Sequence, residues 1–292
     1  MKVVSFTIPV AKEHSIIIQE ERLPYFYNYL HRHNEIQITW VISGEGTLIA
    51  GNYMHPFKAN DIFILGSNQP HIFKSDAAYF EQGSQLLVEA LTVFFHPNGI
   101  LSPLMNLPEM SATRKFIQTT DFGLQVPGAH WKTVSDELLN IKKAEGSLRL
   151  ANFIKLLDYL GSIKDYHLLS TAADDLHISE TEGLRMNDIY QYTMNNYAEN
   201  ITLSQIASIA HLTPQAFCRY FKKHTRKTYL TFLNEIRINE AAKKIVSGNF
   251  DSISSVAYQS GFVHVANFNR VFKKVTGKSP KQYLKEYRHK VN

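Results

Sequence analysis

The C-terminal third of this 292-residue chain contains an internal repeat. Residues 217–225 read FCRYFKKHT and residues 268–276 read FNRVFKKVT, so equivalent residues lie 51 positions apart. The match extends to three further pairs: Lys227 and Lys278, Leu233 and Leu284, and Glu235 and Glu286. Upstream, Ala207 and Ala257 lie 50 positions apart, which places one extra residue in the turn of the second copy. A repeat of this length indicates two copies of one supersecondary unit.

Each copy of the repeat predicts a short helix, a tight turn and a second helix, called here the reading helix. In the first copy Thr202 and Gln205 have the spacing of a capping box. Thr213 followed by Pro214 is the pattern of an N-cap and a first helical residue, where a missing N–H group costs nothing. The first helix is expected to bury four apolar residues: Leu203, Ile206, Ala207 and Ala210. In the second copy, Ser252 is the expected cap and Gly261 with Phe262 forms the turn.

Helical geometry divides each reading helix into a buried and an exposed face. The expected buried residues are Phe217, Tyr220, Phe221 and His224 in the first copy and Phe268, Val271, Phe272 and Val275 in the second. The expected exposed residues are Gln215, Cys218, Arg219 and Lys222, then Ala266, Asn269, Arg270 and Lys273, with Asn267 at the margin. Gln and Asn can bind adenine and Arg can bind guanine, so these faces are candidates for reading DNA. Intramolecular ion pairs or phosphate contacts by Arg219 and Arg270 are the alternative.

The segment 229–246, which joins the two copies, holds no glycine or proline and has apolar residues at helical intervals. A helix of this length spans about 27 Å. Such a connector would hold the two reading helices near the ~34 Å that separates successive major grooves on one face of DNA. The expected target is therefore a direct repeat of half-sites within one chain.

Positive charge is concentrated in the same part of the chain. Residues 183–292 contain 17 Lys and Arg against 6 Asp and Glu, a net charge of +11, whereas residues 1–182 have a net charge of −6. A basic segment joined to an acidic one is typical of a nucleic-acid-binding module attached to a part that does not touch nucleic acid. A lysine-rich surface that is merely solvated is the alternative.

Residues 201–288 resemble the DNA-binding region of the AraC/XylS family of bacterial transcriptional regulators. The residues that carry the resemblance are Ala207, 214–223, Ile236, Arg237, Ala257, Gly261, Phe262, 267–274, Thr276, Gly277, Pro280 and Tyr283. It implies that two groups face two successive major grooves: Gln215, Cys218 and Arg219, and Ala266, Asn267, Asn269 and Arg270. It also implies double-stranded DNA and RNA polymerase as partners, and it leaves open whether the chain activates or represses transcription.

The chain departs from the family pattern at two positions. His211 stands where a glycine is common, and Val263 replaces the usual Ser-type cap of the second reading helix. The second unit is therefore expected to dock less firmly on DNA.

Residues 35–96 read as short β-strands. The apolar runs are 36–42, 47–50, 61–65 and 91–95, and 44–46 marks a turn. Strands this short at such regular spacing predict a small antiparallel barrel or sandwich. The segment 31–73 is similar to the cupin-type sensing barrel found in many AraC/XylS members, with 43–46 as its hairpin and 69–71 closing its second motif.

Four polar residues of this segment are candidate ligand-binding groups: His31, His33, Glu35 and His71. They could form a metal site of the kind that metallo-cupins use, which would favour a metal-dependent cupin enzyme fused to a DNA-binding domain. Glu35 follows His33 by two residues, however, whereas the metallo-cupin motif places its Glu four or five residues after the second His. We therefore expect a polar site for a small-molecule effector, with no metal or other cofactor and no enzymatic activity. Purely structural histidines are the remaining alternative.

The middle of the chain is expected to be helical, with candidate helices at 109–119, 129–143 and 148–164. Apolar residues exceed one face of the third helix, so it is a candidate dimerisation surface. The alternative is that the barrel and the neighbouring helices bury all of it. The polar, acidic stretch 170–183 is the best linker candidate.

The expected fold class is α+β with several domains. Residues 1–105 are expected to form a small antiparallel, cupin-like β-barrel that senses an effector, 106–182 a helical linker and dimerisation region, and 183–292 an all-α domain with two helix-turn-helix units. Cys218 is the single cysteine and cannot form an internal disulfide. The N-terminus lacks the apolar centre of a signal peptide, and no apolar run reaches the about 18 residues of a membrane helix. We therefore expect a cytoplasmic protein that does not enter a membrane.

Overall fold

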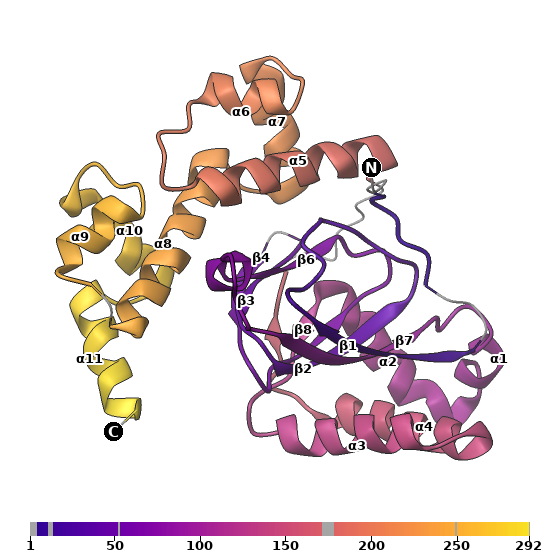
Figure 1. The fold of residues 1–292 in the computed structure, drawn as a ribbon. Helices are drawn as coiled ribbons and strands as arrows, with labels where there is room; N and C mark the ends of the chain where they lie inside the picture. Colours follow the sequence, from indigo (N-terminus) through magenta and orange to yellow (C-terminus); the bar gives the residue numbers. More distant parts are fainter. Residues whose placement is uncertain (1–4, 11–13, 52, 171–177, 249, 292) are drawn as a thin grey trace. The chain divides into compact units, whose positions relative to one another are not determined.

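The structure is a computed structural model that describes residues 5–10, 14–51, 53–170, 178–248 and 250–291. The chain divides into two compact units, Met1–Leu184 and Arg185–Asn292, each described here by itself (Figure 1). Among the helices in the described ranges, none combines the length and the hydrophobicity needed to cross a membrane.

The N-terminal unit contains two antiparallel sheets. The larger sheet has the strand order β1 (Ile16–Leu23), β7 (Val88–Phe95), β2 (Ile36–Ser43), β5 (Ile62–Leu65), β8 (Leu124–Gln125) and β9 (His167–Leu168). The smaller sheet has the order β4 (Tyr53–Phe57), β3 (Gly46–Ala50) and β6 (His71–Ser75). β2 therefore lies in the middle of the larger sheet, between β7 and β5.

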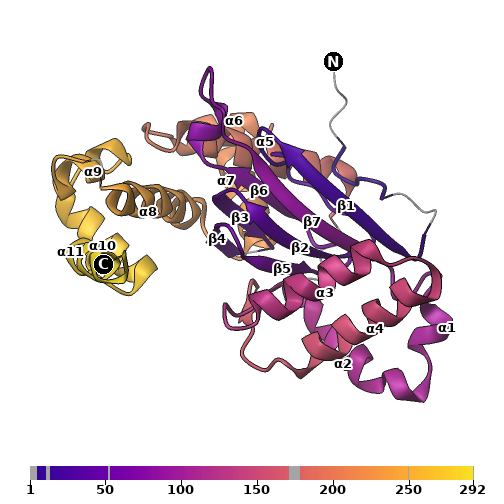
Figure 2. The same cartoon turned by 60° about the horizontal axis from the view of Figure 1, so that its bottom comes forward.

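Along each strand of the larger sheet, side chains alternate between the two faces. Each face packs in a different hydrophobic core. On one face Ile38, Ile64 and Val93 belong to a core with the helices. On the other face Val41, Phe63 and Ala90 belong to a core with the smaller sheet. The helices are α1 (Ser102–Met105), α2 (Ser111–Thr119), α3 (Trp131–Lys143) and α4 (Gly146–Ser162), and Figure 2 shows α2, α3 and α4 together on one side of the strands.

Most apolar residues of α4 are used inside this unit. Phe153, Leu156, Leu157 and Leu160 are fully buried in the core that α4 shares with the sheet. Leu148, by contrast, is 61% exposed. Core packing thus uses much, but not all, of the apolar excess that suggested a dimerisation surface, and self-association through α4 stays a prediction.

The strands expected at 36–42, 47–50, 61–65 and 91–95 are confirmed, as are the three expected helices. Five strands were not expected from the sequence: β1, β4, β6 and the two-residue strands β8 and β9. β4 contains Pro56, which an edge strand tolerates because it does not need every N–H group for pairing. The antiparallel sheets agree with the expected fold class, whereas a closed barrel is not shown.

The expected linker at 170–183 is described only in part. Residues 171–177 lie outside the described residues, and 180–183 form the first turn of α5 (Glu180–Asn196), so this part of the segment is helical and its linker role stays a prediction. Ser179 and Glu182 form a capping box, in which each side chain binds the main-chain N–H group of the other residue. This local hydrogen bonding starts a helix within a stretch whose composition is that of a loop.

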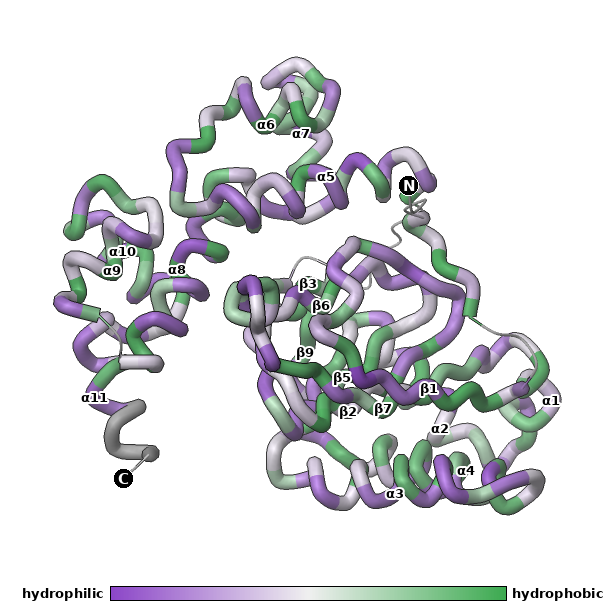
Figure 3. Tube along the Cα trace, in the orientation of Figure 1, coloured by the Kyte–Doolittle hydropathy of each residue, from purple (hydrophilic) through white to green (hydrophobic). Residues whose placement is uncertain are grey.

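The described residues of the C-terminal unit form helices joined by turns and short loops. After α5 come α6 (Leu203–Ile209), α7 (Pro214–Thr225), α8 (Tyr229–Ser247), α9 (Ile253–Gln259), α10 (Val265–Thr276) and α11 (Pro280–Val291). Figure 3 shows hydrophobic and hydrophilic residues alternating along these helices at short intervals. The connector expected at 229–246 is confirmed as α8. Its Phe232 contacts the aromatic residues of the first copy, and its Ile238 and Ile245 belong to the core of the second.

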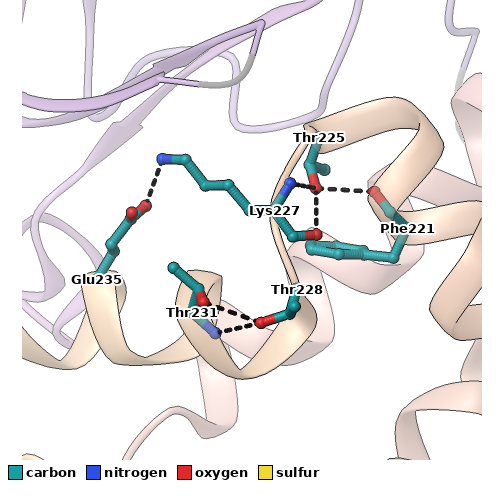
Figure 4. Close-up of polar contacts among 6 residues, drawn as sticks. All are labelled: Phe221, Thr225, Lys227, Thr228, Thr231 and Glu235. Atoms are coloured by element: carbon teal, nitrogen blue, oxygen red, sulfur yellow. Dashed lines mark hydrogen bonds and ion pairs between the residues drawn. The ribbon is translucent and has the colours of Figure 1, made fainter.

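The two copies of the sequence repeat make equivalent contacts at the ends of α7 and α10. At the end of α7, Thr225 donates a hydrogen bond to the Phe221 main-chain oxygen at 2.7 Å and accepts one from the Lys227 N–H group at 3.3 Å (Figure 4). The Lys227 ammonium binds the Glu235 carboxylate at 2.7 Å. The equivalent contacts of the second copy join Thr276 to Phe272 and Lys278, and Lys278 to Glu286. Both copies therefore end their reading helix in the same way.

Candidate functional site

The first helix-turn-helix unit consists of α6 and α7. Thr202 and Gln205 form the expected capping box of α6, and Thr213 caps α7 by accepting a hydrogen bond from the Ala216 N–H group. His211, in the turn, has the left-handed φ of 54°. Two positions expected to be buried differ: Tyr220 of α7 is only half-buried, and Leu203 is 43% exposed because α6 has only two turns and Leu203 begins the first of them.

The second helix-turn-helix unit consists of α9 and α10. Ser252 caps α9 as expected, and Gly261 takes the left-handed conformation in the turn, with a φ of 84°. The N-cap of α10 is His264 rather than Val263, and its side chain makes no capping hydrogen bond. Val263 is 77% exposed. The start of α10 therefore lacks a side-chain cap, at His264 and not at Val263, and weaker docking of this unit on DNA stays a prediction.

The exposed faces of α7 and α10 carry the predicted DNA-reading residues. All nine are exposed: Gln215, Cys218, Arg219, Lys222, Ala266, Asn267, Asn269, Arg270 and Lys273. Phe217, Phe221, Phe268 and Phe272 are buried on the opposite faces, whereas Val275 in the last turn of α10 is 38% exposed, against expectation. The Arg270 guanidinium donates a hydrogen bond to the Asn267 side-chain oxygen at 2.8 Å. Two copies of one helix thus present polar groups at equivalent positions.

Arg237 of α8 links the two helix-turn-helix units. Its guanidinium donates hydrogen bonds to the main-chain oxygens of Tyr197 and Glu199, both at 2.8 Å, in the segment that leads into α6. Its charged centre also lies 5.8 Å from the Phe262 ring, in the turn of the second unit. A single side chain therefore contacts the start of one unit and the turn of the other. The sequence analysis noted Arg237 only as part of the family pattern.

Three of the four predicted effector-binding residues meet in the N-terminal unit. His31 and His71 lie opposite each other in an isolated antiparallel bridge, in which each N–H group binds the other main-chain oxygen. The centroids of these two rings are 4.3 Å apart, and the His33 ring lies 5.1 Å from that of His71. One ring nitrogen of each histidine lies within 4.8 Å of those of the other two. Glu35 is buried but is not a member of this group.

A chain of polar side chains leads from His33 into the space between the sheets. The His33 Nε2 atom lies 2.8 Å from the Gln37 side-chain oxygen, which can only accept. The Gln37 amino group donates a hydrogen bond to the Thr39 hydroxyl at 2.6 Å, and this hydroxyl lies 3.0 Å from that of Thr92. All four residues are buried. The sequence analysis missed Gln37, Thr39 and Thr92. The signal was available for the first two, because they continue the alternation of His33 and Glu35 along one strand face.

Burial sets the charge state of the three histidines. It lowers the pKa of His31 to about 4, because the charged ring loses hydration. The pKa values of His33 and His71 are lowered for the same reason. The three rings are therefore neutral near pH 7 and each offers a lone pair.

Comparisons with known proteins agree with the helix-turn-helix geometry. Residues 206–286 match a family described as "Helix-turn-helix domain". The raffinose operon transcriptional regulatory protein RafR of Pediococcus pentosaceus is 25% identical over 282 residues, which are 91% of either chain. The uncharacterized HTH-type transcriptional regulator YfiF of Bacillus subtilis (strain 168) is 23% identical over 273 residues, 90% of this chain and 81% of the relative.

A solved structure of ToxT from Vibrio cholerae O395, bound to (E)-4-(8-methylnaphthalen-1-yl)but-3-enoic acid, is similar at 19% identity and a TM-score of 0.36. The match covers 94% of this chain and all of that one. A helix-turn-helix region is matched at 206–286, the relatives that align with nearly the whole chain are transcriptional regulators, and the C-terminal unit contains two such units. The chain is therefore a helix-turn-helix transcriptional regulator.

Proposed function

We propose that α7 and α10 each enter a major groove and that the regulator reads a direct repeat of half-sites. The observation that carries this proposal is the pair of equivalent exposed polar faces on a basic unit, joined by one helix. Arg219 and Asn269 would read base edges, and Lys222 and Lys273 would bind phosphates. Gln215, Cys218, Ala266, Asn267 and Arg270 complete the two DNA-facing surfaces.

The proposed arrangement can be tested on the full chain with synthetic DNA. After the half-sites have been located by footprinting, one half-site is inverted while its base composition and spacing are kept. A protein that presents two related reading helices in a fixed direction should lose most of its specific affinity for the inverted DNA, and binding to the direct repeat should weaken steeply with added salt. Equal affinity for the direct and inverted arrangements would refute the proposal.

We propose that the N-terminal unit, within a cupin-like 1–105 region, binds a small-molecule effector at His31, His33, Glu35 and His71 and thereby changes the behaviour of 183–292 on DNA. The supporting observation is that three of these polar side chains converge in a buried setting that an apolar core would not need. Residues 106–182 would transmit the change. Effector coupling of this kind typically alters DNA affinity about 5- to 150-fold.

The effector proposal has a direct experimental route. Sugars, including raffinose, are the first compounds to test because of the name of the relative RafR. Binding is measured by thermal shift of the full chain, followed by DNA titration with and without each hit. A hit that binds equally well after His33→Gln substitution, or that leaves DNA affinity and promoter output unchanged, would contradict the sensing role.

Further proposals concern partners and place of action. A bacterial regulator that binds the chromosome would act in the cytoplasm, without catalysing a reaction, and would contact RNA polymerase when it activates transcription. Self-association through α4 stays a prediction, and Leu148 is the residue to change because its side chain is exposed. If Leu148→Glu leaves the oligomeric state of the parent intact, α4 is not the interface.

A further inference from the structure

The three histidines of the N-terminal unit are oriented alike by the main chain. The Nδ1 atoms of His31, His33 and His71 lie 2.9, 2.8 and 2.9 Å from the main-chain oxygens of Tyr29, Glu35 and Gln69. A carbonyl oxygen can only accept, so the Nδ1 atoms of His31 and His71 carry the proton and their neutral rings keep the lone pair on Nε2. In His33 both ring nitrogens face acceptor oxygens, because its Nε2 atom lies 2.8 Å from the Gln37 side-chain oxygen. Hydrogen bonds of this kind hold metal-binding histidines in position and fix their tautomer.

The Nε2 atom of His71 has no hydrogen-bond partner among the residues that the structure describes, although the side chain is 1% exposed. A buried acceptor without a partner costs free energy that the fold must offset elsewhere. Such atoms in a native fold call for an explanation, and an ion is one of the ordinary explanations. Here the unpartnered atom belongs to a group of three histidines whose ring nitrogens converge.

We propose that His31, His33 and His71 bind one divalent transition-metal ion of the zinc type through their Nε2 atoms. Three neutral imidazoles suit zinc, nickel or copper and not the oxygen-seeking magnesium or calcium. Three histidines leave the fourth position open, as in metal sites that bind water or an exogenous ligand. The metal site stands on its own geometry, whereas its influence on DNA binding rests on the proposed sensing function.

The spacing of the histidines requires only a small adjustment. Ligand nitrogens around a tetrahedral zinc ion at about 2.05 Å lie about 3.4 Å apart. Because the nitrogens lie within 4.8 Å of one another, each ring nitrogen has to move by at most about 0.8 Å to reach this spacing. His33 must also release the Gln37 side-chain oxygen, which lies 2.8 Å from its Nε2 atom, and keep its proton on Nδ1 so that Nε2 can bind the metal. The bridge between His31 and His71 already brings their main chains together. The remaining shifts therefore need only rotations about the side-chain torsions.

The test uses the full chain, freed of metal with a chelator. Titration with Zn²⁺ should show one tightly bound ion per chain, and Co²⁺ bound in its place should show the visible absorption of a four-coordinate cobalt site. X-ray absorption of the bound zinc should show imidazole nitrogens as its ligands. Uptake well below one ion per chain, or a cobalt spectrum like that of the hexahydrated ion, would overturn the proposal.

Substitutions locate the ion. His71→Gln and His33→Gln should each weaken Zn²⁺ binding at least tenfold, because each removes a ligand. His55→Gln is the matched control, since His55 lies in the same unit beside His167 but outside the group. Circular dichroism shows whether each variant folds; if one does not, the cobalt spectrum and X-ray absorption of the parent chain decide. Unchanged binding in both folded variants would move the ion elsewhere and refute the assignment.

A separate measurement tests the metal site independently of the proposed sensing function. The DNA affinity of the full chain is compared with and without Zn²⁺ at a concentration that saturates the site. A change that His71→Gln abolishes supports both the site and the sensing role. Stoichiometric binding without any change in DNA affinity or in the response to an effector leaves the metal site established and contradicts the sensing role.

Discussion

Arg237 donates a hydrogen bond from its Nε atom to the main-chain oxygen of Tyr197, at 2.8 Å. A second bond, to the Glu199 oxygen, and the neighbouring Phe262 ring place this side chain between the two helix-turn-helix units. The planar guanidinium can serve two acceptors at once, which a lysine ammonium cannot do in the same geometry. Arg237 therefore helps to fix how far apart the two reading helices lie.

Comparing Arg237→Lys with Arg237→Ala is expected to show how much of the effect of Arg237 comes from its charge and how much from its two directed hydrogen bonds. Arg237→Ala should lower the free energy of unfolding of the C-terminal unit by about 1–2 kcal/mol, because two bonds to a charged donor are lost. Arg237→Lys should recover less than half of that loss and should weaken binding to paired half-sites more than to a single half-site. Hydrogen exchange in residues 197–262 and DNA titrations measure both effects. Full recovery by lysine would show that only the charge matters.

Gly261 is expected to tolerate no side chain. A Cβ atom there would lie 2.8 Å from Arg237 Nε and 2.8 Å from the Tyr197 oxygen, on a backbone with a φ of 84°. Gly261→Ala should therefore cost more than about 1 kcal/mol of unfolding free energy, from backbone strain and the displaced arginine together. Urea unfolding followed by circular dichroism measures it.

The equivalent turn of the first unit provides the control for Gly261. His211 is exposed and takes a left-handed φ of 54°. His211→Gly should stabilise the unit by up to about 1 kcal/mol, since glycine takes this conformation without a steric cost. A cost for His211→Gly comparable to that of Gly261→Ala would mean that the two turns are not equivalent.

The start of α10 is expected to gain stability from a capping residue. His264 occupies the N-cap without a capping hydrogen bond, whereas Thr213 caps α7 through the Ala216 N–H group at 3.3 Å. His264→Thr should raise the free energy of unfolding by about 1 kcal/mol, and Thr213→Ala should lower it by about 0.5–2 kcal/mol. Opposite shifts of the urea midpoint, with equal slopes, are the expected result. A neutral His264→Thr would show that solvent already satisfies this helix end.

Base reading and phosphate binding are expected to differ in their sequence dependence. Arg219→Ala and Asn269→Ala should each cost about 1–3 kcal/mol at the cognate site and relax the preference for particular bases, because each removes a contact to a base edge. Lys222→Ala should weaken all sequences alike and reduce the salt dependence. Selection of binding sites with each variant distinguishes the two classes. An unchanged site preference for both Arg219→Ala and Asn269→Ala would reassign these residues to phosphate or structural roles.

Local patterns in the sequence determined much of the C-terminal unit. Capping at Thr202, Thr213 and Ser252 depends on hydrogen bonds between residues three positions apart, so the sequence contains all that is needed to predict it. The apolar period of the reading helices likewise predicted which faces are buried, apart from helix ends such as Leu203 and Val275, where few neighbours cover a side chain.

Contacts between distant segments were decided only by the tertiary structure. The sequence placed His31 and His33 on one strand face, but the pairing of His31 with His71 across 40 residues is what brings their rings together. Arg237 likewise finds its acceptors on main-chain oxygens, which carry no mark in a sequence. A periodic pattern reports which side of an element is apolar; which element packs on that side depends on the free energy of all the pairings together.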